Sequence, residues 1–362
     1  MIMDDLPPQK SYRTPGRGAG SNPDVRFDRL HAEAVDDGWL PKQDVPVLRT
    51  EVRDEIARSV ITRNTSPDLS FDRSINPYRG CEHGCIYCFA RPSHAFLGLS
   101  PGLDFETRLI ARPNAAAQLR KELSHRNYVP RTIAIGTNTD PYQPIEKQRE
   151  IMRNVLMVLR DFNHPVGIVT KGTLIERDID ILAPMAARGL VRIGVSITTL
   201  DPRTARAMEP RVPGPAARLR IIRRLTDAGV PVRVMVSPVV PALTDHELEA
   251  ILEAAKEAGA VAASSIMLRL PREVATLFKD WLAEHYPDRA ARVMARVREL
   301  HGGKDYDPEF GTRMVGQGQW AEMLQQRFKL ATRKLGLDRP LLPLRTDLFA
   351  KPPESGDQLS FF

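Results

Sequence analysis

Residues 80–89 read Gly-Cys-Glu-His-Gly-Cys-Ile-Tyr-Cys-Phe and hold every cysteine of the 362-residue chain, namely Cys81, Cys85 and Cys88. Three thiols so close together exclude a disulfide framework, because such a framework needs an even number of cysteines. Nucleophilic catalysis would need only one thiol, so metal ligation explains the cluster better. The loop is therefore the element around which we expect the fold and the chemistry to be organised.

The choice of metal depends on the number of ligands that the chain can supply. A structural zinc site needs four ligands, and His83 or His94 could provide the fourth, but the usual spacing of two ligand pairs far apart in the sequence is missing here. A 4Fe–4S cluster held by three thiolates leaves one iron open for a small-molecule ligand. The sequence favours a 4Fe–4S cluster on Cys81, Cys85 and Cys88, with zinc or a purely structural cluster as the alternative.

The composition limits the partners and the cellular location that can be expected for the protein. Lysine and arginine outnumber aspartate and glutamate by 52 to 45, which permits nucleic-acid binding without requiring it. No run of eighteen apolar residues predicts a membrane span. The stretch Met1–Gln9 lacks the apolar core of a secretory signal. With thiols that must stay reduced, the expected location is the cytoplasm.

Short β-branched runs alternate with amphipathic segments along the middle of the chain. The predicted strands are Phe71–Asn76, Thr132–Gly136, Val166–Thr170, Val191–Ile197, Val232–Val236 and Val261–Leu268, and the predicted helices between them include Ile145–Arg160, Glu176–Arg188, Pro215–Ala228 and Asp245–Ala258. Such alternation predicts an α/β fold with a parallel sheet, here a partial (β/α)6 TIM-like barrel. The rival is an open doubly wound sheet. No Gly-x-Gly-x-x-Gly follows a strand, which argues against a dinucleotide-binding fold.

Four regions are expected along the chain. Residues 1–50 predict a flexible basic extension, 51–270 the barrel, 271–351 a helical C-terminal extension and 352–362 a tail. The helices expected in the extension are Val274–Ala283, Arg289–Leu300 and Gln319–Leu335. A solvated tail explains the first 50 residues better than a segment that follows a phosphate backbone.

The cysteine spacing, with the aromatic Tyr87 just before the last cysteine, resembles the cluster loop of the radical S-adenosylmethionine (SAM) superfamily. Lys171 after a threonine at the third strand and Ser196 two residues before a threonine at the fourth are similar to the branch related to spore photoproduct lyase and DNA repair photolyase. Within that branch the chain looks closest to an uncharacterised bacterial subfamily. The resemblance spans about residues 74–268 and implies the same partial barrel.

By this resemblance the cofactors are a 4Fe–4S cluster and SAM, reduced by a donor such as flavodoxin or ferredoxin. Tyr87 would lie near the adenine, Lys171 near the methionine carboxylate and Ser196 near the ribose or the amino-acid end. Thr137, Asn138 and Thr139, at the end of the second strand, offer further polar groups of the kind that SAM needs. Ordinary loop chemistry also favours such residues at strand ends.

One departure affects the reaction. The lyases use a cysteine at the end of the second strand as a hydrogen donor, and here Gly136, Thr137 and Asn138 occupy that place. Tyr142 could act instead as a radical relay, although a packed loop aromatic explains it better. Photoproduct cleavage is therefore not predicted, and radical chemistry of lyase or oxidoreductase type on a nucleic acid, in the manner of DNA repair, is the expectation. A peptide or a small metabolite is the next choice of substrate.

Arginines and acids after the fourth strand allow two interpretations. Glu209 to Arg211 and Arg218 could close over a ligand, or they could form a salt-bridged loop. The helical arginines Arg218, Arg220, Arg223 and Arg224 are typical of a solvated surface. No paired carboxylates for acid–base work stand out.

The chain ends in Gln358, Leu359, Ser360, Phe361 and Phe362. Two aromatics on a polar tail offer anchors for the pocket of a partner. The sequence resembles the peptide by which bacterial replication and repair proteins bind the sliding clamp, although Phe361 stands where leucine is frequent. A tail folded onto its own surface is the other interpretation. For the whole chain, the alternative to an enzyme is a non-catalytic, metal-stabilised or Fe–S-stabilised nucleic-acid-binding module.

Overall fold

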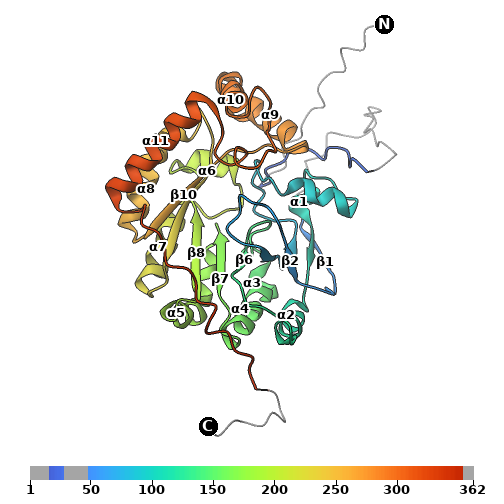
Figure 1. Cartoon of the computed structure of the whole chain (residues 1–362). Helices are drawn as coiled ribbons and strands as arrows, with labels where there is room; N and C mark the ends of the chain where they lie inside the picture. Colours follow the sequence, from blue (N-terminus) through green and yellow to red (C-terminus); the bar gives the residue numbers. More distant parts are fainter. Residues whose placement is uncertain (1–15, 28–47, 354–362) are drawn as a thin grey trace.

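The computed structural model describes residues 16–27 and 48–353, and its centre is a seven-stranded sheet (Figure 1). The strands are β2 Ile61–Arg63, β3 Arg73–Ile75, β6 Ile133–Ile135, β7 Val166–Thr170, β8 Val191–Ser196, β9 Val232–Val239 and β10 Ala262–Met267. Their order in the sheet is β10-β9-β8-β7-β6-β3-β2. All neighbours are parallel except β2, which runs antiparallel to β3 at the edge.

The six parallel strands follow one another in chain order, without the reversal that marks a doubly wound sheet. The helices between and after them are α2 Ala115–Ser124, α3 Glu146–Arg149, α4 Ile151–Asp161, α5 Ile179–Ala187, α6 Pro202–Met208, α7 Pro215–Asp227 and α8 Leu248–Glu257, with single 3-10 turns η2 Thr173–Asp178 and η3 Asp245–Glu247. The edge strands β10 and β2 do not pair with each other, so the barrel is incomplete. The predicted partial (β/α)6 barrel is confirmed.

The alternation of side chains along each strand separates a packed outer face from an inner face. On β8, Val191, Ile193 and Val195 are buried in the main hydrophobic cluster together with side chains of the surrounding helices. Arg192, Gly194 and Ser196 point to the other face because successive side chains of a strand alternate. This inner face carries small and polar residues, and it is the face that lines the barrel.

The helix predicted over residues 145–160 is broken into α3 and α4. Glu150 lies between them with φ +50°, a left-handed conformation that ends one helix and begins the next. The buried Glu146 accepts hydrogen bonds from the Met152 amide (3.1 Å) and from Tyr78 Oη (2.5 Å). These interactions fix the kink between α3 and α4 against Tyr78, which belongs to a second sheet described next.

A three-stranded sheet beside the barrel was not predicted. Its strands are β1 Glu51–Asp54, β5 Arg108–Ala111 and β4 Tyr78–Arg79, in the order β1-β5-β4, and the 3-10 helix η1 Arg91–Leu97 and helix α1 Asp104–Thr107 lie between β4 and β5 in the chain. β1 is polar and mostly exposed and β4 has two residues, so neither gives an apolar alternation in the sequence. The cysteine loop leaves directly from β4.

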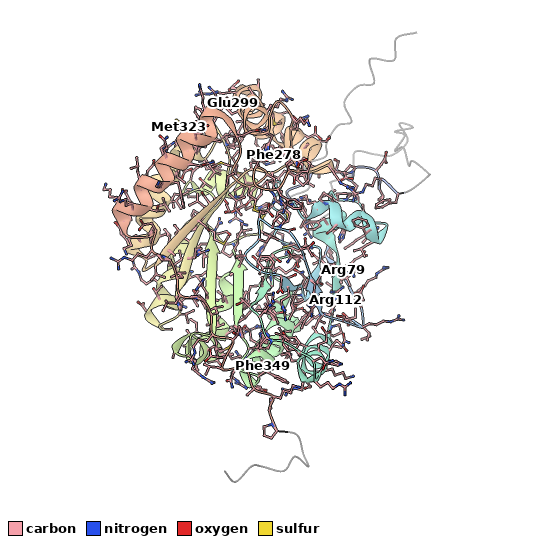
Figure 2. The ribbon with its side chains drawn as sticks, in the orientation of Figure 1. Arg79, Arg112, Phe278, Glu299, Met323 and Phe349 are labelled. Carbon is pink, nitrogen blue, oxygen red and sulfur yellow. The ribbon has the colours of Figure 1, made fainter. Side chains whose placement is uncertain are left out.

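The C-terminal extension consists of α9 Glu273–His285, α10 Pro287–Leu300 and α11 Gly318–Leu335, close to the predicted bounds. Figure 2 shows Phe278, Glu299 and Met323 together at this end of the molecule. Ala321 and Leu324 of α11 belong to the same buried cluster as the barrel strands, whereas Phe278 and Trp281 of α9 are buried in a second cluster with Tyr87 of the cysteine loop. No helix in residues 16–27 and 48–353 is long and apolar enough to cross a membrane.

Residues 16–27 differ from the flexible extension that the sequence predicted for residues 1–50. Ala19 is buried, and Ser21 accepts a hydrogen bond from the Leu103 amide (3.2 Å). Arg26 forms an ion pair with Glu273 of α9 (3.0 Å). That prediction is wrong for this segment, because its backbone binds buried groups of the barrel, while residues 1–15 and 28–47 lie outside the described residues.

The C-terminal strap, residues 337–350, runs from β10 across the ends of the strands where they begin. The Leu337 carbonyl accepts a hydrogen bond from Ala263, the Gly189 carbonyl before β8 accepts one from Arg345, and the Phe162 carbonyl before β7 accepts one from Ala350. Figure 1 shows this segment passing α5 toward the bottom of the view, away from α9 and α10. The clamp-like peptide, residues 358–362, lies outside the described residues.

Phe349 anchors the strap, and Figure 2 shows it at the lower end of the molecule. Its ring centroid lies 5.5 Å from that of Tyr128 and 5.6 Å from that of His164. Burial lowers the pKa of His164 to about 4, and its Nε2 shares a hydrogen bond with Tyr128 Oη (2.7 Å). The strap is therefore fixed against a neutral histidine.

This neutral histidine predicts a loss of stability in acid. The unfolded chain takes up a proton at His164 near pH 6.5 and the folded one near pH 4, so the free energy of unfolding should fall by about 3 kcal/mol as pH drops through this window. His164→Gln should flatten that slope between pH 6.5 and 4 in urea titrations. Equal slopes for the variant and the wild type would show that His164 does not titrate in this way.

Candidate active site

The cysteine loop is shaped by two glycines in left-handed conformations. Gly80 has φ +77° and Gly84 has φ +65°, and a Cβ on Gly84 would lie 2.6 Å from Glu106 Oε2. The Cys81 amide donates to the Phe105 carbonyl (2.9 Å). The loop is therefore a series of tight turns held against α1, and side chains larger than hydrogen are not accommodated at its glycines.

Arg91, the third residue after Cys88, binds the loop from behind and is completely buried. All five N–H groups of a guanidinium find an acceptor here. The acceptors are the carbonyls of Cys85 (3.0 Å), Gly84 (3.1 Å), Pro101 (3.2 Å) and Gly102 (2.9 Å), and Glu106 Oε1 (2.5 Å). Arg91 therefore fixes the backbone that carries the thiols, although it is not itself a candidate metal ligand.

The N-terminal clasp, residues 17–19, completes the back of the loop. Glu106 Oε2 accepts from the Gly18 amide and Oε1 from the Ala19 amide, both at 2.9 Å. Arg17 donates to the Glu106 carbonyl (2.9 Å). A Cβ on Gly18 would lie 1.8 Å from the Gly84 carbonyl oxygen, so the clasp and the loop touch through backbone alone.

This contact makes Gly18→Ala a local test of the clasp. The added methyl must push the clasp away from Gly84, which breaks two hydrogen bonds to a buried carboxylate, so we expect the free energy of unfolding to fall by about 2–4 kcal/mol. Gly214→Ala is the control, since no atom lies within 4 Å of its Cβ position. Chemical denaturation checks the difference, and equal stability of the two variants would contradict the contact.

The three thiols are free, and their environment suits ligation. Cys81 and Cys85 are buried and Cys88 is half-buried. Burial raises the pKa of Cys81, and it raises the pKa of Cys85 to about 12. Without a metal the site therefore keeps protons on these thiols, whereas positively charged iron would stabilise the thiolates.

Two further observations bear on what the site can hold. In the described part of the chain, no three His, Cys, Asp or Glu side chains are grouped so as to hold a single metal ion. Asn76 Oδ1 and Ser237 Oγ, at the C-terminal ends of β3 and β9, are buried without a hydrogen-bond partner. Such orphaned atoms fit a polar ligand lying across the strand ends. Three thiols beside polar strand ends would fit an iron–sulfur group with a polar ligand next to it.

Asp140, after β6, ties the loop to the neighbouring strand ends. Its carboxylate accepts from Thr170 Oγ1 and from the Lys171 amide, both at 2.7 Å, and lies 3.3 Å from His83 Nδ1. Burial opposes the charge of Asp140, yet His83 and these donors outweigh it and lower the pKa to about 2. Asp140 therefore acts as a charged brace between residues 81–85 and the end of β7.

Glu209, after α6, is the centre of a second buried network on the other side of the loop. It accepts hydrogen bonds from Tyr87 Oη and from Thr198 Oγ1 (2.9 Å), and forms a fully buried ion pair with Arg218 (2.6 Å). Burial works against the charge of Glu209, but Arg218 and Lys171 outweigh it and lower its pKa. The network holds the ring of Tyr87 beside the thiols.

Lys171 lies between these networks, with its Nζ 5.8 Å from the centre of the Tyr87 ring. Burial would lower its pKa, but the nearby Cys85 and Glu209 raise it above the ordinary value. Ser196, buried on the inner face of β8, accepts from Arg218 through its carbonyl (3.0 Å). Tyr87 and Lys171 thus lie next to each other beside the cysteines, and Ser196 is linked to them through Arg218 and Glu209.

The other candidate residues have different environments. Thr139 is buried, and its hydroxyl donates to the Tyr78 carbonyl (2.9 Å), which is a structural role. Thr137 and Asn138 are half-buried in the bend after β6. Tyr142 is packed in the main hydrophobic cluster, as expected for a loop aromatic.

Sequence reasoning missed part of this support. Arg218 was interpreted as solvated surface and is completely buried, so that interpretation is wrong, while the salt-bridged alternative is confirmed by its pairing with Glu209. The helical spacing carried the signal, since Arg218 shares a face with Ile221, Ile222 and Leu225. Nothing in the sequence indicated the acceptors of Arg91.

The cysteine loop, braced by buried charges, places three free thiols at the carboxyl ends of the strands, where the active sites of barrel enzymes lie. The family model of the radical SAM superfamily matches residues 75–255. The chain belongs to this superfamily.

Known proteins similar to the chain include an uncharacterized protein of Mycobacterium tuberculosis, 34% identical over 336 residues that cover 89% of this chain and 95% of that protein. An uncharacterized protein of Methanocaldococcus jannaschii is 25% identical over 214 residues, covering 59% and 76%. Among solved structures, spore photoproduct lyase complexed with dinucleoside spore photoproduct superposes with a TM-score of 0.57 at 16% identity, over 78% of this chain and 79% of the lyase. That similarity establishes a common fold.

Proposed function

We propose that the protein is a radical SAM enzyme that acts on a nucleic acid, with a 4Fe–4S cluster on Cys81, Cys85 and Cys88. The observation that carries the proposal is the placement of these thiols beside Lys171 and the Tyr87 ring. When bound, the cluster supplies the electron that splits SAM into methionine and a 5′-deoxyadenosyl radical, which removes a hydrogen atom from the substrate.

The residues of the chain bind and orient the cofactors. Lys171, charged and held between Tyr87, Cys85 and Glu209, is placed to pair with the methionine carboxylate. Ser196 and the orphaned Ser237 Oγ offer hydroxyls to the ribose or the amino group, and Tyr87 a flat ring to the adenine. Thr137 and Asn138, in the bend after β6, are further polar groups that we propose for cofactor binding. Asp140 and Glu209 keep these groups in place and neutralise the cations.

Two features support a nucleic acid as substrate: the net charge of +7 and the fold shared with a lyase solved with a dinucleoside lesion. A DNA-repair reaction of lyase type is the form that we propose, with a peptide or small metabolite as the other substrates to test. Oligonucleotides carrying deuterium in the sugar or in the thymine methyl group should transfer it into 5′-deoxyadenosine. Transfer from labelled peptides or metabolites alone would contradict a nucleic-acid substrate.

The hydrogen donor to the substrate radical differs from that of a lyase with a fourth cysteine, because this chain has only three. Tyr142 is an unsuitable relay, since it is packed in the hydrophobic core. We propose that 5′-deoxyadenosine, which carries the abstracted hydrogen atom, gives it back to the product radical and becomes the 5′-deoxyadenosyl radical again. The electron donor would be a flavodoxin or ferredoxin, and the working location the cytoplasm.

Partner binding through the tail gives a further prediction. Residues 358–362 follow the strap in the chain, and we propose that this peptide binds a sliding clamp. Deleting Leu359–Phe362 should abolish capture by a bacterial sliding clamp and leave the iron content unchanged. Capture that persists after the deletion would contradict clamp binding by this peptide.

A further inference from the structure

Two arginines lie on the inner face of the barrel, near the ends where the strands begin. Arg192 of β8 pairs in register with Gly167 of β7, and Arg233 of β9 pairs with Gly194 of β8. Residues two apart in a strand share a face, so Arg192 and Gly194 lie on the same side of β8. Arg233, the partner of Gly194, lies on that side too, and the two arginines are therefore diagonal neighbours. The opposite face is filled by valine and isoleucine of the core.

Neither arginine has an acidic partner within residues 16–27 and 48–353. Arg192 Nη2 donates a hydrogen bond to a neutral acceptor, the carbonyl of Leu342 in the C-terminal strap. Arg233 Nε is buried and finds no acceptor among the same described residues. Two neighbouring guanidiniums without a carboxylate partner, one of them with an unsatisfied buried N–H, form a site that can bind an anion.

The neighbouring strands leave room in front of the two arginines. At the same level, the register places Gly167 beside Ala134 of β6, and Ala134 beside Ser74 of β3. These are small residues, and in the part of the chain that the structure describes no atom lies within 4 Å of the position that a Cβ on Gly167 would take. Gly167, Arg192 and Arg233 are each partly reached by solvent. The space is therefore open and adjoins the guanidiniums.

We propose that Arg192 and Arg233 bind a phosphate or a phosphoryl group inside the barrel, at the end opposite the cysteine loop. Guanidiniums match the oxygens of a phosphate with paired hydrogen bonds, and the orphaned Arg233 Nε supplies one of the donors. The Leu342 carbonyl orients Arg192 toward the site. Small side chains on β3, β6 and β7 provide the volume.

Electrostatics agrees with this geometry. Burial lowers the pKa of Arg192, and the charge of Arg233 lowers it further, so the pair is strained by like charges until an anion binds. Arg192 precedes Ser196 by four residues, which separates their α-carbons by about 13 Å along the strand. The site is thus distinct from the region around Lys171 and does not depend on the proposed function.

Calorimetric titration of the cluster-reconstituted protein with inorganic phosphate, at constant ionic strength, tests the site. The wild type should bind phosphate, and Arg192→Met/Arg233→Met should weaken binding about tenfold or more. Gly167→Leu, which fills the open space and keeps both arginines, should weaken it similarly. Arg220→Met, on the exposed face of α7, is the matched control and should bind as the wild type does.

Two results would overturn the proposal: no phosphate binding by the wild type at millimolar concentration, or equal binding by the double variant. Ribose 5-phosphate separates the sources of the group. If ribose 5-phosphate binds more tightly than phosphate and loses its binding in the same variants, the site takes the phosphoryl group of a larger ligand. If ribose 5-phosphate binds more weakly than phosphate, the site takes the free ion. The double variant should still form 5′-deoxyadenosine, so failure of this site and failure of the radical chemistry are read separately.

Discussion

Replacing Arg91 with methionine should release the cysteine loop and abolish stable cluster loading. The change removes five hydrogen bonds, four of them to carbonyls of residues 84–102, and leaves the buried carboxylate of Glu106 without its cation. Breaking a buried pair by removing one partner costs about 3–5 kcal/mol. We expect a loss of this size in the free energy of unfolding and a reconstituted iron content far below that of the wild type.

The control and the conservative variant make this expectation specific. Arg126→Met removes an exposed arginine and should change neither property. Arg91→Lys keeps the charge but offers three donors from a single atom, so it should restore part of the stability and little of the iron. Full iron loading by Arg91→Met would show that the loop holds its shape without this residue.

The second large effect is expected at Glu209. Glu209→Gln leaves Arg218 buried without a counter-charge, and one end of the amide is an NH2 donor, so the side chain can no longer accept from Arg218 at one end and from Tyr87 and Thr198 at the other. The free energy of unfolding should fall by about 3–5 kcal/mol, and the affinity for SAM should fall because Tyr87 and Lys171 lose their brace. Urea denaturation and equilibrium dialysis with labelled SAM measure the two effects.

A double-mutant cycle separates the pair from its surroundings. Arg218→Met alone strands the charge of Glu209, whereas Glu209→Gln/Arg218→Met removes both charges, so the double variant should be more stable than the sum of the single losses predicts. Arg220→Met, two residues along the same helix and exposed, serves as the control. Additive losses would mean that the two side chains do not depend on each other.

The barrel could be predicted from the sequence because its strands are β-branched runs between helices of regular period. β7 spans the predicted Val166–Thr170, and β8 ends one residue before the expected boundary. The cysteines stood out by their number and spacing. Lys171 and Ser196 were predicted as site residues because chemistry gathers at the carboxyl ends of barrel strands, and their roles stay a prediction; Lys171 lies beside the Tyr87 ring, and the Ser196 carbonyl accepts from Arg218.

The supports of the site could not be predicted, since they depend on contacts between distant parts of the chain. Glu106 binds Gly18 across 88 residues of sequence, and no local pattern encodes that approach. β1 and β4 are too short or too polar to give a periodic signal. Arg218 was misinterpreted because its neighbours Arg220, Arg223 and Arg224 suggested a solvated face, although its helical position lay with the apolar residues.

The central claim is that Cys81, Cys85 and Cys88 hold a cluster that supports radical SAM chemistry. Its most direct test is anaerobic reconstitution with iron and sulfide, followed by dithionite and SAM, with 5′-deoxyadenosine quantified by mass spectrometry for the wild type and Cys85→Ala. We predict iron and 5′-deoxyadenosine in the wild type and loss of the product in the variant. Zinc in place of iron and no 5′-deoxyadenosine from the wild type would contradict the claim and favour a non-catalytic, metal-stabilised module.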